Sequence, residues 1–160
     1  MHPNPLPPPP RAILTGKNLL NMIHDMVGTK LFQHFYVIDH TGQEIDASEG
    51  GNLSCAQVVS GILVLNDLME RIRATVPTCL KDMEASGWYK TDQPAPGSVI
   101  HWAANGNGHE HLGFYIDEHT AMSNSSQQGV PVLQGLNMPD GRPPIAFYTH
   151  PNLPKRLLSQ

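Results

Sequence analysis

The sequence predicts an α+β fold in which N-terminal helices pack on an antiparallel β-sheet. In the first half of the chain, apolar residues recur at spacings of three and four, which is typical of amphipathic helices. From Trp88 onward, short apolar runs alternate with Pro, Gly and Asn, which is typical of strands joined by turns. Because the helices precede the strands instead of alternating with them, the order argues against a parallel βαβ sheet.

Composition indicates one globular domain. The chain has 160 residues, of which 39% are hydrophobic and 15% are charged, and this length suffices to bury a core. The formal charge of −4 and the lack of a Lys/Arg stripe exclude an obvious nucleic-acid-binding surface. No apolar run reaches the length of about 18 residues that a membrane span needs, so no membrane partner is expected.

The proline-rich start of the chain sets the expected domain boundaries. Residues 1–11 are predicted to be an extended tail or linker, with an SH3-type ligand as the alternative reading. The folded domain is expected over 12–150, followed by a C-terminal tail over 151–160. The start lacks a charged segment followed by an apolar core, so no signal peptide is expected. Localisation is left open: the protein stays inside, leaves by a signal-independent route, or is part of a longer secreted chain. We expect a monomer or a part of a larger chain.

The first helix is followed by an extended segment. Thr15 can cap the start of this helix, and Gly28 suits its C-terminal cap. The helix carries apolar residues on one face, namely Leu19, Leu20, Ile23, Met26 and Val27. Residues 31–39 are expected to form a short strand, followed by a turn at 40–42 and a polar, glycine-rich approach over 44–52.

The second helix carries the strongest pattern. Ser54 stands at its N-cap position, so Cys55 opens the helix on its buried face. The same face continues through Val58, Ile62, Leu65, Met69 and Ile72. A shorter helix is expected after Pro77 and stops at Gly87. The strands expected after Trp88 are 98–102, 111–117, 121–124, 130–134 and 144–149.

Cys55 is the candidate nucleophile because of its place at a helix start. Free N–H groups and the positive end of the helix dipole stabilise a thiolate and can also receive an oxyanion. Ser54, beside it, is a candidate for substrate binding. The alternative is that Cys55 is an ordinary buried thiol. Cys79 opens a shorter helix and is better explained as structural, although a disulfide between the two cysteines is also possible.

His111 is the candidate base because it begins a regularly alternating strand. Gly113 would share its face and leave room for substrate, whereas the opposite face would carry Leu112, Phe114 and Ile116. The alternative is a surface histidine at a strand start. Asn124 lies one hairpin further on and can orient the imidazole ring, with Ser123 as its rival. Plain turn chemistry also explains this polar run.

Four segments follow one another in an order that resembles a known family. They are SCA (54–56), SGW (86–88), PAPGSVIHW (94–102) and HLGFYID (111–117). This order resembles the NlpC and CHAP group of papain-like bacterial cell-wall hydrolases, over roughly residues 16–149, and the last two segments are the specific ones.

The resemblance implies a papain-like domain with Cys55 as nucleophile, His111 as base, and Asn124 or Ser123 as the third polar residue. An aromatic residue upstream of the cysteine often lines the site in this family, and Tyr36 is the candidate. The implied reaction cleaves an amide bond in peptidoglycan peptides, or between peptide and glycan, through a thioester. It needs no metal and no organic cofactor.

Two rival functions keep the same fold. A thiol protease or acyltransferase would act on a substrate outside the cell wall, and an inactive binding domain would hold the cysteine and histidine apart. A zinc site is a further alternative, because His109 and His111 form an H-x-H pair with His101 and His119 nearby in sequence.

Overall fold

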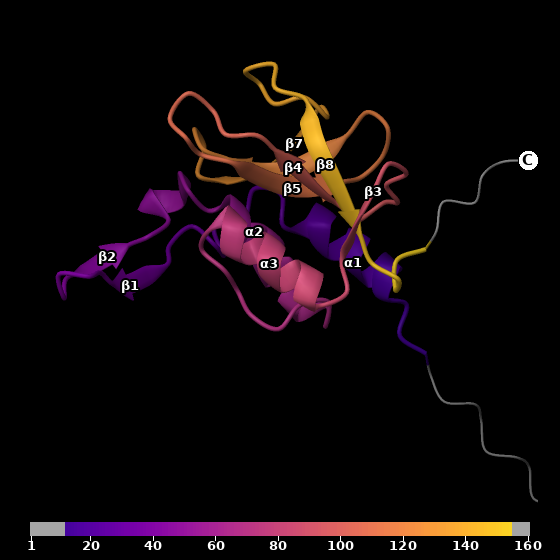
Figure 1. Ribbon diagram of the computed structural model, residues 1–160, viewed down its shortest axis with the longest axis horizontal. Coiled ribbons are helices and arrows are strands. Elements are labelled where there is room, and N and C mark those ends of the chain that lie inside the picture. The colour runs from indigo at the N-terminus through magenta and orange to yellow at the C-terminus, as the bar shows by residue number, and fades with distance from the viewer. Residues whose placement is uncertain (1–11, 155–160) are drawn as a thin grey trace, which may run out of the picture.

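The computed structural model describes residues 12–154 and has an α+β fold. Helices α1 (Thr15–Asp25), α2 (Cys55–Leu65) and α3 (Val76–Ala85) lie on one side of a six-stranded antiparallel sheet (Figure 1). The predicted fold class is therefore confirmed at this level. The predicted N-terminal tail and the last six residues of the predicted C-terminal tail lie outside the described residues. No helix within the described range is long and apolar enough to cross a membrane.

The sheet contains the five predicted strands and one more. Its order is β3-β8-β4-β5-β6-β7, and every neighbouring pair is antiparallel. The predicted strands are β4 (Val99–Trp102), β5 (His111–Tyr115), β6 (Ala121–Ser125), β7 (Val130–Gln134) and β8 (Pro144–Thr149). The additional strand, β3 (Tyr89–Thr91), pairs with the end of β8. Its three residues are too few, and too exposed, to show an alternating pattern.

A small hairpin replaces the strand predicted over 31–39. Only β1 (Tyr36–Ile38) is extended, and it pairs with β2 (Glu44–Asp46), a segment predicted to be a loop. The hairpin projects from the body of the protein (Figure 1). Polar bonds hold its base, because the Asp46 carboxylate accepts the N–H groups of Phe35 at 2.9 Å and Ser48 at 3.0 Å. Apolar periodicity carries no signal for such pairing.

Boundaries of all three predicted helices were wrong. Thr15 lies inside α1 and makes no capping bond, since the N-cap position is Leu14. The second helix ends at Leu65 instead of continuing to residue 72. Asn66 ends it, because its side-chain amide donates to the Ile62 carbonyl at 2.9 Å. The chain then reverses at Asp67, whose φ is +55°. The next helix, α3, begins at Val76 and is capped by Thr75, so Pro77 lies in its first turn, and Cys79 does not open the helix as predicted.

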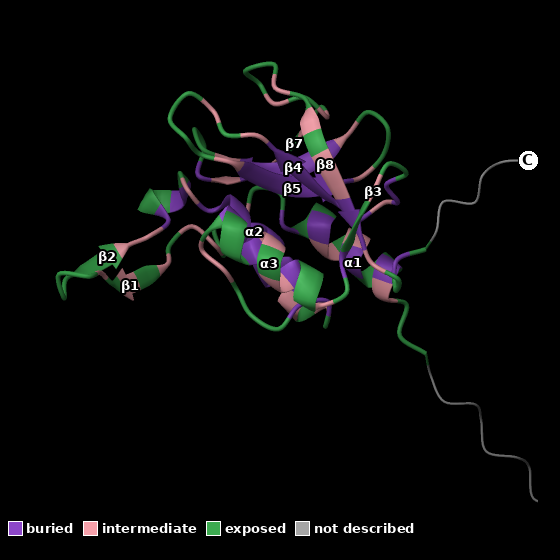
Figure 2. Cartoon of the chain, in the orientation of Figure 1, coloured by how far each residue is buried: buried purple, intermediate pink, exposed green. Residues whose placement is uncertain are grey.

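The central strands are buried on both faces (Figure 2). Toward the helices, Leu112, Phe114 and Met122 join one core with residues of α2. On the opposite face, Trp102 and Tyr115 join a second core, which the loop after β7 covers with Leu136 and Met138. The predicted alternation along β5 is therefore present. It places Leu112 and Phe114 on the helix side, and His111 on the side of Trp102.

Candidate active site

The segment before α2 fixes the position of Cys55. This segment contains the short helix η1 (Glu49–Gly51), which packs on the turn between β6 and β7. Gly51, the last residue of η1, has a φ of +96°. A side chain at Gly51 would clash with the backbone of Gly129. The Asn124 amide donates to the Gly51 carbonyl at 2.6 Å. These contacts tie the start of α2 to the sheet, so the thiol is held at a defined place.

Cys55 lies against the start of β5, at a gap in the sheet. The backbone N–H of Tyr115 donates to the Ser98 carbonyl at 2.7 Å, so the backbone groups of Tyr115 face the β4 side. Because backbone groups along a strand face its two neighbours in turn, those of Glu110 and Leu112 face β6. However, β6 pairs with β5 only over residues 113–115. Cys55 contacts the unpaired part of this edge, with its Sγ 3.9 Å from the Glu110 carbonyl oxygen.

The surroundings of Cys55 favour the protonated thiol. Burial raises its pKa above the usual value, and the nearby Glu110 carboxylate adds to this effect. The backbone N–H groups of Leu112, Ala56 and Cys55 itself oppose the shift, because they stabilise the thiolate. These N–H groups stand where negative charge would develop on sulfur. The arrangement therefore suits a thiol that loses its proton only when a base takes it.

His111 is a neutral imidazole held by a hydroxyl. Its Nε2 lies 3.0 Å from Ser123 Oγ, and its ring packs on Trp102 with a centroid distance of 5.6 Å. Burial, helped by the charge of the Arg142 guanidinium and opposed by the Asp140 carboxylate, lowers the pKa of His111 to about 4. With Nε2 engaged by Ser123, Nδ1 is the ring nitrogen left to accept a proton.

Cys55 and His111 line one pocket of about 400 Å³. The pocket also receives polar groups from other segments, including Asn52, Thr75 and Arg142. Within the described part of the chain, no hydrogen bond joins the thiol to the imidazole, and the thiol instead donates to the Glu110 carbonyl. Catalytic hydrogen bonds often form only when substrate is bound, so this geometry is compatible with a resting site.

Ser123, and not Asn124, contacts the His111 ring. Gly113 and Ser123 are direct partners between β5 and β6, so Ser123 shares the face of His111. Asn124 points to the other face and holds the segment before α2. The two residues were predicted to lie on a strand adjacent to β5, which they do. The imidazole contact predicted for Asn124, with Ser123 as its rival, is made by Ser123, because side chains alternate along β6.

The three predicted substrate-binding residues do not line this pocket. Ser54 is fully buried, and its hydroxyl has no partner among the described residues. Tyr36 lies on the projecting hairpin, where it stacks on His34 with 63% of its surface exposed. Gly113 is packed between strands, where a side chain would clash with Met122 and Ser123. Its small size serves strand packing at the His111 face.

Sequence reasoning missed the residues that surround the pair. Gln134 accepts a hydrogen bond from the Ser123 hydroxyl at 2.9 Å, and Glu110 pairs with His101 at 2.9 Å. Arg142 donates to the Ala103 carbonyl beside the pocket. Gln134 ends a predicted strand, so a correct register for β6 and β7 would have found it. Arg142 lies in a loop, where no pattern indicates what it contacts.

In the described part of the chain, the two cysteines form no disulfide and the histidines form no metal site. Cys55 and Cys79 are both free, and burial raises the pKa of Cys79 to about 12. Among residues 12–154, no three His, Cys, Asp or Glu side chains lie close enough together to hold a metal ion. His101 is engaged with Glu110, whereas His119 is exposed and lies next to Glu118.

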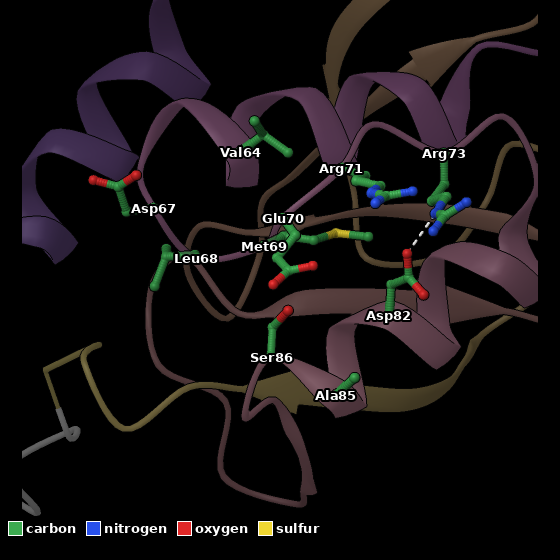
Figure 3. Close-up of a pocket in the computed structure, with 10 residues that line it drawn as sticks. All are labelled: Val64, Asp67, Leu68, Met69, Glu70, Arg71, Arg73, Asp82, Ala85 and Ser86. Carbon is green, nitrogen blue, oxygen red and sulfur yellow. Dashed lines mark hydrogen bonds and ion pairs between the residues drawn. The ribbon is translucent and has the colours of Figure 1, made fainter.

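A second cavity lies near the opposite end of α2 (Figure 3). It is larger, at about 770 Å³, but it contains neither cysteine nor histidine. Its Arg73 and Asp82 side chains pair with each other. Because it lacks a nucleophile and a base, we assign the candidate active site to the smaller pocket.

The role of Asn124 leads to a prediction on stability. Asn124→Ala removes the buried bond to Gly51, and we expect it to lower the free energy of unfolding by about 1–3 kcal/mol in urea titrations. Asn107→Ala, in an exposed turn, is the matched control and should change it little. An unchanged midpoint for Asn124→Ala would contradict the assigned anchoring role.

No protein-family model matches this sequence, and no curated protein matches it either.

Proposed function

We propose that this protein is a papain-like cysteine hydrolase that cleaves an amide bond in peptidoglycan peptides. The observation that carries the proposal is the pocket shared by Cys55, at the start of α2, and His111, at the start of β5. The resemblance of the sequence to the NlpC and CHAP group supplies the substrate class. The order of a helix-start cysteine followed by an antiparallel sheet is consistent with that group.

The proposed reaction is acyl transfer through a thioester. His111 Nδ1 takes the proton of Cys55 as sulfur attacks the amide carbonyl carbon. The tetrahedral intermediate then collapses: the C–N bond breaks, and the amine leaves with the proton from Nδ1. Water attacks the thioester, gives a proton to Nδ1, and releases the carboxylic acid as the Cys55 thiol is restored. The N–H of Cys55 is the proposed oxyanion donor.

Neutral partners suit this sequence of steps. The thiol and the imidazole are both uncharged near neutral pH, because burial raises the pKa of Cys55 and lowers that of His111. A neutral imidazole is a base that can accept the thiol proton during the attack. The thiolate and the imidazolium then develop only in the transition state, where the N–H groups around sulfur stabilise the negative charge.

Purified muropeptides provide the direct test. We expect incubation with the protein to convert a muropeptide into two fragments whose summed mass exceeds the parent by one water, and tandem mass spectra will identify the cleaved bond. Transfer of the acyl group to an added amine, without hydrolysis, would instead indicate an acyltransferase. If neither reaction occurs with intact folded protein, cell-wall peptides are not its substrate.

A further inference from the structure

A chain of three polar side chains runs from the pocket across two strands. His111 Nε2 lies 3.0 Å from Ser123 Oγ, and Ser123 Oγ donates to Gln134 Oε1 at 2.9 Å. Register explains this alignment, because Ser123 on β6 lies diagonally opposite Gln134 on β7, and both share the face of His111. His111 and Ser123 are buried, and Gln134 is half-buried at the outer end of the chain.

The direction of this chain follows from donor and acceptor chemistry. A serine hydroxyl has one hydrogen, and an amide carbonyl oxygen can only accept. If that hydrogen goes to Gln134, Ser123 Oγ has only lone pairs to offer to His111. Nε2 must then carry the imidazole hydrogen, and Nδ1 must carry the lone pair. The Gln134 amide is oriented by its other end, where its NH₂ donates to Met138 Sδ at 3.4 Å.

We propose that Gln134 is a positioning residue that fixes the tautomer of His111 through Ser123, leaving Nδ1 as the base. This inference deepens the proposed function and rests on it for its catalytic meaning. Gln134 itself touches neither the thiol nor the pocket. Gln134 acts by accepting the hydrogen bond from the Ser123 hydroxyl. The loop after β7 holds Gln134 in place through Met138, which packs on the face of the sheet that carries Trp102.

Two substitutions separate this role from plain packing. Gln134→Glu keeps an oxygen that can only accept, so the Ser123 hydrogen should stay directed away from His111. Gln134→Met has a similar length but replaces the amide oxygen with a thioether sulfur, which is only a weak acceptor, so Ser123 can donate to Nε2 and allow the Nδ1–H tautomer. Gln128→Met, in an exposed turn, is the matched control. If Gln134 fixes the tautomer, Gln134→Glu should keep the hydrogen of His111 on Nε2, and Gln134→Met should not.

The tautomer can be read without any substrate. Long-range ¹H–¹⁵N spectra of the ¹⁵N-labelled protein at pH 7 distinguish a protonated ring nitrogen from an unprotonated one. We expect protonated Nε2 in the wild type, in Gln134→Glu and in Gln128→Met, and a shift toward protonated Nδ1 in Gln134→Met. Wild-type protein with protonated Nδ1 would overturn the inference, and this reading does not depend on the folding of any variant. An unchanged tautomer in folded Gln134→Met would overturn it as well.

Kinetics give the second reading. With a muropeptide that the wild type cleaves, Gln134→Met should lower kcat by about tenfold or more with little change in KM. The reason is that a hydrogen on Nδ1 of His111 prevents this atom from accepting the thiol proton. Gln134→Glu should restore most of the rate. The two hypotheses fail separately: loss of the expected tautomer removes the role of Gln134 alone, whereas hydrolysis that survives Cys55→Ala removes the proposed function and leaves the tautomer result intact.

Discussion

Cys55→Ala is expected to abolish hydrolysis, with a loss of at least about 10⁴-fold in kcat/KM. The reason is that the thiol is the strongest nucleophile among the side chains that line the pocket. The hydroxyl groups of the lining belong to Thr75, which caps α3 through its bond to Thr78, and to Ser126, which lies in the exposed turn after β6. The measurement is release of muropeptide fragments by wild type and variant at equal concentrations of folded protein.

Cys79→Ala is the matched control for this experiment. It removes a second buried thiol of the same protein, but Cys79 lies on α3 and does not line the pocket. We expect its activity per folded molecule to stay close to that of the wild type. Full hydrolysis by Cys55→Ala would refute the thioester mechanism. If a chelator then abolished that activity, a histidine-bound metal would replace the cysteine as the reactive centre.

Acidification from pH 6.5 to pH 4 is expected to cost the folded protein about 3 kcal/mol through His111 alone. Its pKa is lowered from 6.5 to about 4, so within this interval the unfolded chain binds a proton that the folded protein excludes. The unfolded state is therefore favoured as the pH falls through the window. Above the window His111 is neutral in both states, and below it His111 is charged in both, so its contribution stops changing.

Urea titrations at pH 4, 5 and 7 measure this effect. His111→Gln removes the titrating group but keeps an amide that can donate to Ser123, so its stability should fall less steeply with acid than that of the wild type. His24→Gln, on the exposed side of α1, is the control and should keep the wild-type slope. Identical slopes for wild type and His111→Gln would refute the burial of a neutral His111.

The pH profile of kcat/KM should show a loss of activity below about pH 4, where His111 is protonated and cannot act as a base.

Local patterns predicted the elements that bury a continuous apolar face. Strands β7 and β8 have the predicted boundaries, and Cys55 opens α2 as expected. The extent of α2 was wrong because apolar spacing continues past Leu65 into a loop whose Met69 is also buried. A buried loop residue and a buried helix residue give the same signal. Asn66 and Asp67 stop the helix through side-chain bonding and backbone reversal, which the spacing does not register.

The candidate site divides in the same way. The sequence by itself determined the α+β class and the pair Cys55 and His111 as candidates, because helix starts and alternating strands are local features. Only the tertiary structure decided which polar residues serve that pair. Strand register directs Ser123 to the imidazole and Asn124 to Gly51, and it brings Gln134 into line behind Ser123. It also opens the gap beside β5 where the thiol lies. Register depends on pairing between segments distant in sequence, and a shift of one residue exchanges the two faces of a strand.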